Sequence, residues 1–206
     1  MVSALAASGQ GTMIYDQQSA TNRSFSGAGY PFQAEQPAGQ SFTPTFSSVG
    51  FVQFEFSDFH PGDGAGATVY VNLRADSLTG PILDLTAPVA MPDGFSLGIT
   101  NCFFATSAAV TPGTTYYLQP VLQSGDGSWN IIAGPFNYPS GTFFEYGSPD
   151  PNGFNAWFRE GDLTPEPSSG MLLLVGFAGM WVVRRLRGRK GGNNRHSNLA
   201  SMSACC

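Results

Sequence analysis

Short stretches in which apolar and polar residues alternate recur along most of this chain. Val52, Phe54 and Phe56 alternate with Gln53 and Glu55, a period of two that is typical of a strand with one face toward a core. In the same part of the chain, no amphipathic period of 3.6 residues persists for three helical turns. The pattern therefore predicts strands rather than helices.

Thr68–Arg74 and Thr114–Gln123 also favour strands, because they are rich in Val, Tyr and Thr and are bounded by Gly or Pro. Weaker strand candidates are Thr12–Asp16, Gly39–Thr43, Ile82–Val89, Cys102–Thr106, Ser128–Ala133, Gly141–Tyr146 and Phe154–Arg159. Turn sequences such as Pro61–Gly64 and Gly125–Gly127 separate them, since Pro fixes φ and Gly supplies positive φ. About ten short strands with such turns predict an all-β fold, an antiparallel β-sandwich.

A different pattern occupies residues 170–183, GMLLLVGFAGMWVV, which carry no charge. The run is apolar on every side, so as a helix it has no polar face to show water. Fourteen residues span about 21 Å as a helix, against roughly 30 Å of hydrocarbon in a bilayer. Arg184 and Arg185 can snorkel, which lengthens the insertable stretch, and Trp181 lies at the end of the run, at interface depth. We predict one C-terminal transmembrane helix; a core helix of the globular part is the alternative. Its residues are Met171, Leu172, Leu173, Leu174, Val175, Gly176, Phe177, Ala178, Gly179, Met180, Trp181, Val182 and Val183.

Charge divides the chain at Gly170. Before it, all fourteen acidic residues stand against three basic ones, Arg23, Arg74 and Arg159; after it there are six basic residues and no acidic one. An acidic body repels phosphate backbones, which argues against nucleic acid as a partner. Basic residues directly after a membrane span hold that end in the cytoplasm, so we expect the body to lie outside.

Three features follow one another near the C-terminus: a Pro-Glu-Pro motif, the apolar run and an Arg-rich end. This order resembles the PEP-CTERM sorting signal over residues 164–190. The resemblance implies export, a transient anchor in the inner membrane, and processing near the motif by an exosortase, a membrane-embedded cysteine-dependent peptidase. It also implies a setting of exopolysaccharide production and biofilm formation. The resemblance assigns recognition to Pro165, Glu166 and Pro167, and topology to Arg184, Arg185 and Arg187. Residues 191–206 are expected to form a disordered cytoplasmic tail, which such signals usually lack.

The first ten residues, MVSALAASGQ, match an exported protein only in part. They lack a basic start and a long apolar stretch, yet Ala4-Leu5-Ala6 has the small-x-small form of a signal-peptidase site. We interpret residues 1–10 as the remnant of a signal peptide whose start lies upstream; a flexible terminus is the alternative. The sandwich is then expected to occupy residues 11–163.

Local phrases add a second resemblance. Gln40–Pro44, Val69–Arg74 and Thr111–Tyr117 resemble segments of the jelly-roll ectodomains that are often found before PEP-CTERM signals. The resemblance covers about residues 12–160 and implies a jelly-roll-like sandwich. It implies little about function, because such sandwiches carry many unrelated roles.

Residues for catalysis are scarce. The two histidines, His60 and His196, have no evident partner, and no HExxH, GxSxG, Walker or paired-cysteine motif occurs. We therefore expect no enzyme and no cofactor. Cys102 has no second cysteine in the exported part, and its phenylalanine neighbours predict a buried small hydrophobe.

Two kinds of ligand site can be considered in the body. Trp129 and Tyr138 follow or precede turn residues and are the aromatics most suited to stack on a sugar, whereas Trp157 is expected in the core. Loop carboxylates could bind Ca²⁺, although aspartate in a Gly-rich turn usually serves the turn itself. These carboxylates are Asp16, Asp58, Asp63, Asp126 and Asp162.

Together these observations predict an exported protein of the bacterial cell envelope or extracellular matrix. Its expected role is structural or adhesive and linked to exopolysaccharide or biofilm. The alternative is a carbohydrate-binding module that holds the cell's own polysaccharide. An exposed row of aromatic rings or an ordered groove would favour the alternative.

Overall fold

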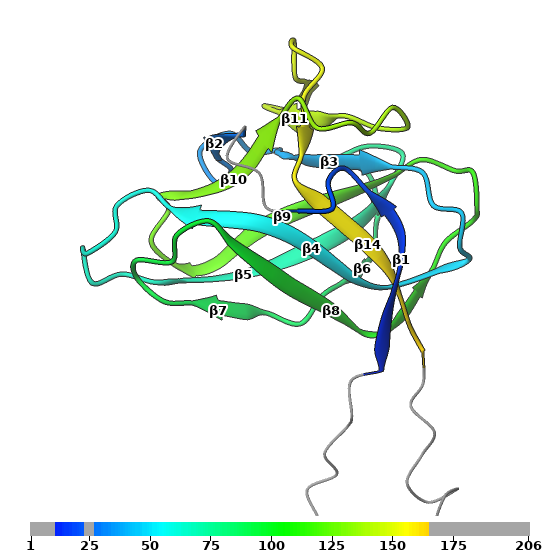
Figure 1. Ribbon diagram of the computed structural model, residues 1–206, viewed down its shortest axis with the longest axis horizontal. Coiled ribbons are helices and arrows are strands. Elements are labelled where there is room, and N and C mark those ends of the chain that lie inside the picture. Colours follow the sequence, from blue (N-terminus) through cyan, green and yellow to red (C-terminus); the bar gives the residue numbers. More distant parts are fainter. Residues whose placement is uncertain (1–10, 23–26, 165–206) are drawn as a thin grey trace, which may run out of the picture. The chain divides into compact units, whose positions relative to one another are not determined.

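Two antiparallel sheets face each other in the computed structural model, which describes residues 11–22 and 27–164 (Figure 1). The described part contains fourteen strands and no helix, and it belongs to one compact unit. The predicted all-β, sandwich-like class is confirmed at this level. The expected number of about ten strands was too low, because short additional strands pair at the margins of both sheets.

The first sheet is built around its longest inner strand, β4 (Ser48–Asp58). One edge of β4 pairs with β8 (Gly98–Ala109), and its other edge pairs first with β14 (Phe158–Thr164) and then with β10 (Trp129–Gly134). The remaining strands are β1 (Thr12–Gln18) beside β14, and β2 (Ala28–Pro31) and β13 (Asn155–Ala156) beside β10.

The second sheet has β5 (Ala67–Ala75) and β9 (Tyr116–Gly125) as its paired central strands. The order across this sheet is β12-β11-β3-β9-β5-β6, and β7 also pairs with β5. The other bounds are β3 (Gly39–Phe42), β6 (Ile82–Leu85), β7 (Val89–Met91), β11 (Phe143–Glu145) and β12 (Ser148–Pro149).

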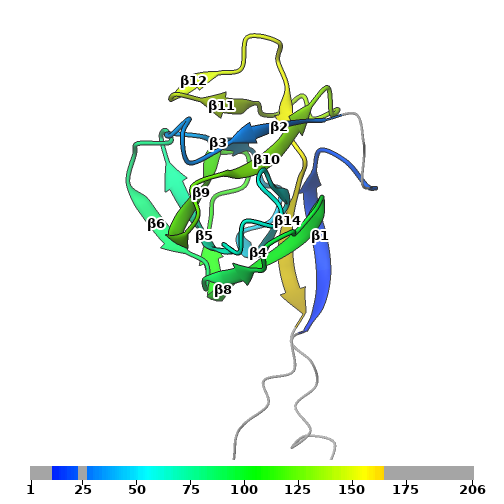
Figure 2. The same cartoon turned by 90° about the vertical axis from the view of Figure 1, so that its left-hand side faces the viewer.

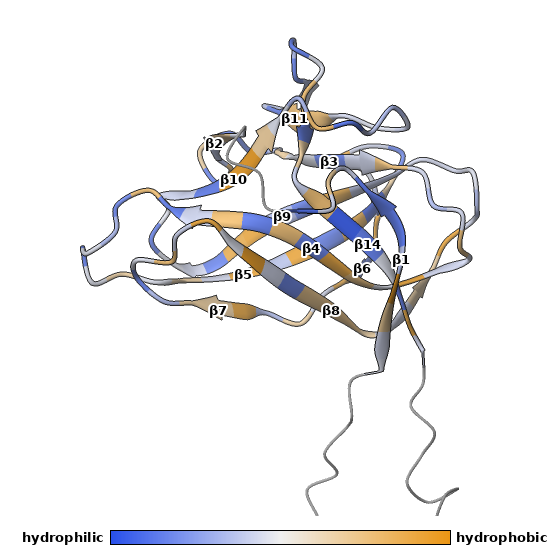
Figure 3. Ribbon diagram, viewed as in Figure 1, coloured by the Kyte–Doolittle hydropathy of each residue, from blue (hydrophilic) through white to orange (hydrophobic). Residues whose placement is uncertain are grey.

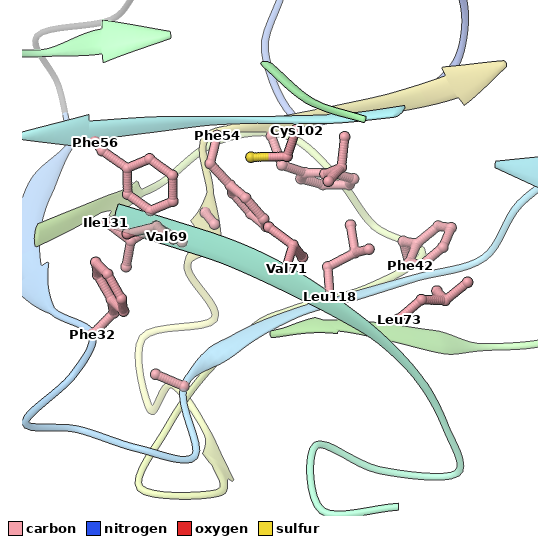
Figure 4. Close-up of a cluster of buried hydrophobic side chains, with 14 of the residues drawn as sticks. Phe32, Phe42, Phe54, Phe56, Val69, Val71, Leu73, Cys102, Leu118 and Ile131 are labelled. Atoms are coloured by element: carbon pink, nitrogen blue, oxygen red, sulfur yellow. The ribbon is translucent and has the colours of Figure 1, made fainter. Parts of the chain in front are cut away.

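The core lies between the two sheets and is dominated by phenylalanine and branched aliphatic side chains. Figure 4 shows Phe54, Phe56 and Cys102 pointing from the first sheet toward Val69 and Val71 of β5. This is the inward face that the period-two pattern of β4 predicts. Large aromatic rings provide most of the buried apolar area in such a core.

The opposite face of β4 is buried as well, which the alternation did not indicate. Gln53, only 6% exposed, donates from Nε2 to Oδ1 of Asn101 on β8 at 2.6 Å and also contacts Sδ of Met13 on β1. Long side chains of neighbouring strands therefore cover this face, and the buried amide finds partners there.

The chain enters and leaves the sandwich at one place, because β1 and β14 pair antiparallel from Thr12↔Thr164 to Gln18↔Arg159. Figure 2 shows the two strands side by side. The register shifts between Tyr15 and Gln17, so Asp16 forms a bulge. Figure 3 shows hydrophilic stretches on this pair, in contrast with the hydrophobic β10.

Several sequence predictions lie outside the described residues. They are the signal-peptide remnant (1–10), the Pro165–Pro167 motif, the transmembrane helix (Met171–Val183), the topology arginines (184, 185 and 187) and the tail (191–206). Within residues 11–22 and 27–164, no helix has the length and apolar character needed to cross a membrane.

Candidate functional site

The two aromatic residues predicted to be exposed sugar platforms are both buried. Trp129 is 0% exposed and its ring lies 6.1 Å from that of Phe95. Tyr138 is 6% exposed, its ring meets Phe158 edge-on at 5.0 Å, and its hydroxyl accepts from the N–H of Thr43 at 3.0 Å. Neither ring offers a face to a ligand, so the stacking role proposed for them was wrong.

The local sequence explains the error for Trp129. The Gly-Asp-Gly-Ser turn ends one residue earlier, and Trp129 is already the first residue of β10, paired with Asp58 at the end of β4. A residue at that register joins the core cluster even though its neighbours in sequence are turn residues. Trp157 is 0% exposed, so its predicted burial is confirmed, but it lies outside the core cluster and carries Arg159 on its ring.

Asp58, Asp63 and Asp126, three of the proposed calcium ligands, lie in the loops at one end of the sandwich. Asp93, which the sequence analysis did not select, lies with them. Asp93 accepts from the N–H groups of Gly62 and Gly64 at 2.7 and 2.9 Å, and these bonds lower its pKa. Asp58 likewise accepts from the backbone N–H groups of His60 and Gly94. These carboxylates organise turns, the alternative that the sequence left open.

Asp63 and Asp126 act in the same way, each accepting a backbone N–H two residues later in its own loop, at 2.7 Å. Asp16 and Asp162 lie elsewhere, on β1 and β14, so the five candidates do not form one site. Within the ranges that the structure describes, no group of three or more His, Cys, Asp or Glu side chains is arranged to hold a metal ion.

Cys102 is fully buried in the core, as predicted for a small hydrophobe. Burial raises the pKa of its thiol to about 12, because a thiolate in apolar surroundings loses its hydration. A thiol in this state is not a nucleophile at neutral pH.

The arrangement best suited to contact a ligand is an Arg159 stack, formed by Tyr15, Arg159 and Trp157. The Cζ atom of Arg159 lies 4.8 Å from the centroid of Trp157 and 5.4 Å from that of Tyr15. Its Nε donates to the carbonyl of Ala20 at 2.9 Å. Two rings and one carbonyl therefore fix the guanidinium, while Tyr15 itself stays 41% exposed.

Register explains why these side chains meet. Arg159 is opposite Gln53 on β4, which is opposite Asn101 on β8, so a guanidinium and two amides form a row across three strands. In the next row Gly161 separates Tyr15 from Phe51. Because glycine has no side chain there, the two rings meet over it at 5.5 Å, edge to face.

The sequence analysis did not predict the Arg159 stack, although the spacing of two of its residues indicates that they lie on the same face. Trp157 and Arg159 are two residues apart, so in a strand they point to the same side. The third member, Tyr15, comes from the far end of the domain, and only the β1–β14 register brings it into place.

No protein-family model and no curated protein sequence matches this chain.

Proposed function

We propose that this chain is an exported protein of the bacterial cell envelope or extracellular matrix, with a structural or adhesive role linked to exopolysaccharide or biofilm. The observation that carries the proposal is the order of the Pro-Glu-Pro motif, the charge-free run of residues 170–183 and the basic end that follows. In this proposal the run forms a transmembrane helix, the acidic body is a jelly-roll-like ectodomain outside the membrane, and an exosortase removes the anchor.

The junction between the body and the motif supports this assignment. β14 ends at Thr164, and the motif begins at the next residue, Pro165. Both edges of β14 are paired, with β1 and with β4. Processing after about Ser169 would therefore remove none of the paired strands and would release the sandwich whole.

Intact-mass measurement on protein recovered from the surface of the producing bacterium tests the proposal. We expect a mature form that lacks everything after about Ser169. Replacing Arg184, Arg185 and Arg187 by Glu should block this processing, because the positive charges hold the C-terminal end in the cytoplasm. The matched control is Arg195→Glu, farther from the run, which should be processed normally. A surface form that still ends at Cys206 would contradict the sorting mechanism.

The Arg159 stack favours polysaccharide binding as a second candidate function. An exposed Tyr15 ring beside a fixed guanidinium, with the exposed amide of Asn101 in the next strands, offers one stacking surface and polar groups for hydroxyls. The experiment is a glycan array with the protein recovered from the cell surface. Tyr15→Ala should abolish binding, whereas Tyr146→Ala, which removes an exposed ring at another site, should not.

A further inference from the structure

One carboxyl group in the sandwich is buried beside another carboxyl group. Glu160 of β14 is 0% exposed, its carboxyl oxygens make no hydrogen bond of ordinary geometry, and its nearest polar neighbours are the backbone N–H of Gln17 and the carboxyl group of Asp16. A buried carboxylate of this kind is costly unless it is paired or takes up a proton. The position of Glu160 therefore requires explanation.

The register places Glu160 on the inner side of the first sheet. Its neighbour two residues earlier on the strand, Phe158, belongs to the core cluster, and it is opposite Val52, which belongs to the same cluster. On the other edge of β14 it is opposite Gln17, beside the bulge at Asp16. Glu160 thus lies where β1, β14 and β4 meet.

The ionisable groups around Glu160 are acidic or neutral. Asp16 on β1 and Asp162 on β14 contribute negative charge, and Tyr138 from the loop before β11 lies on the same side. The residues of β4 that face inward there, Val52 and Phe54, do not ionise. Arg159 belongs to the opposite face of the sheet, where it stacks on Trp157.

Burial, and after it the negative charge of Asp16, raise the pKa of Glu160 to about 9. Asp16 itself is held by other groups: it accepts from the N–H groups of Thr45 and Phe46 at 2.7 and 2.9 Å, and from the Thr45 hydroxyl. These bonds are made by the ionised form of Asp16, so Asp16 keeps its charge while Glu160 takes up the proton.

We propose that Glu160 is a proton-dependent latch, which in its neutral form holds the terminal strands β1 and β14 closed on the sandwich and which loosens this pair when the proton is lost. The strand that the latch controls is the one that ends at Thr164, next to the Pro165–Pro167 motif. This inference rests on the described part alone and does not need the proposed sorting function.

The sign of the effect follows from linkage. Below pH 4.5 the carboxyl is protonated in both the folded and the unfolded chain, and the contribution of the latch is fully present. Between pH 4.5 and about 9 only the folded form holds the proton, so the folding equilibrium constant falls by up to tenfold per pH unit. Local opening of β1 and β14 is expected within this window.

Hydrogen exchange on the full-length protein at pH 6 and pH 8 tests the latch, read as protection factors corrected for the intrinsic rate. Protection of the β1–β14 amides should fall at pH 8 by tenfold or more and should then be lower than protection in β5 and β9, because β1 and β14 open before the rest of the sandwich unfolds. In Glu160→Gln the difference between the two pH values should vanish. The matched control is Asp76→Asn, an exposed carboxylate at positive φ, where Asn is equally tolerated.

Two results would overturn the proposal: β1–β14 amides that are as well protected at pH 8 as those of β5 and β9, or an unchanged pH response in Glu160→Gln. If that variant does not fold, wild-type protein with ¹³C-labelled glutamate carboxyls carries the test. A carboxyl resonance that titrates above pH 8 supports the latch, and its absence from a complete set of resonances contradicts it.

Discussion

Gln40 joins the two sheets of the sandwich by donating from Nε2 to Oδ1 of Asn155 at 2.9 Å. Its Oε1 accepts from the N–H of Ala156 at 2.7 Å, and Nε2 also contacts the carbonyl of Ser41. Both Gln40 and Asn155 are buried. One side chain of β3 therefore satisfies two polar groups of β13 in the opposite sheet, in a place where water could not replace it.

Replacing Gln40 by Leu should destabilise the protein by about 2–4 kcal/mol, because the amide oxygen of Asn155 and the N–H of Ala156 would stay buried without this partner. The control is Gln123→Leu, an exposed position on β9, which should change the free energy of unfolding by less than about 0.5 kcal/mol. Urea denaturation followed by tryptophan fluorescence measures both. Equal midpoints for the two variants would contradict the role of Gln40.

The sequence was sufficient for the fold class but not for this contact. Val52, Phe54 and Phe56 alternate with polar residues, and alternation of that kind directly reports a strand face. Gln40 and Asn155 are 115 residues apart, and nothing local indicates that they meet. The prediction that Trp129 is exposed was wrong for a related reason, because one residue of register decides whether a ring next to a turn faces the core.

Gly161 should tolerate no side chain. A Cβ atom at this position would lie 1.9 Å from the carbonyl oxygen of Ile14, and this atom belongs to the paired backbone of β1. Gly161→Ala should therefore cost about 2–4 kcal/mol and disturb the β1–β14 pair. Thermal unfolding followed by circular dichroism measures the loss.

Gly127 provides the opposite case as a control. A Cβ atom there meets nothing within 4 Å, and its φ is not in the left-handed region. Gly127→Ala should stabilise the protein by about 0.4–1 kcal/mol, because it reduces the freedom of the unfolded chain. The prediction about Gly161 is wrong if Gly161→Ala does not lower the melting temperature relative to Gly127→Ala.

Cys102 should be chemically silent in the folded protein. Its thiol, with a pKa of about 12, is protonated at pH 8, and no path from solvent is open because the side chain is fully buried. In a variant with Cys205 and Cys206 replaced by Ser, iodoacetamide should leave Cys102 unmodified without urea and should modify it completely in urea. Stoichiometric modification of protein with unchanged circular dichroism would contradict this prediction.

Asp16 and Asp162 make the free energy of unfolding depend on pH in the opposite direction to Glu160. Burial alone would raise the pKa values of Asp16 and Asp162, but hydrogen bonds outweigh it and both values lie below 3.8. For Asp162 these bonds come from the hydroxyls of Ser107 and Ser48. A depressed pKa contributes stability that is present above the unfolded value and is lost as the pH falls through the folded value.

Glu160 acts in the other direction, because its pKa is raised from 4.5 to about 9 and its contribution is lost as the pH rises through that window. Burial also raises the pKa values of Glu35 and Glu145, which adds to the same trend. The free energy of unfolding should therefore be greatest at about pH 4–5 and fall above it by up to about 1.4 kcal/mol per pH unit. Urea denaturation between pH 3 and pH 9 measures the profile.

Glu160→Gln should make the limb above pH 5 less steep, leaving the contributions of Glu35 and Glu145. Asp162→Asn should make the limb below pH 4 less steep, leaving the contribution of Asp16. A maximum between pH 7 and pH 8 would mean that Glu160 is ionised in the folded protein, and it would contradict the opposing action of these three carboxyls.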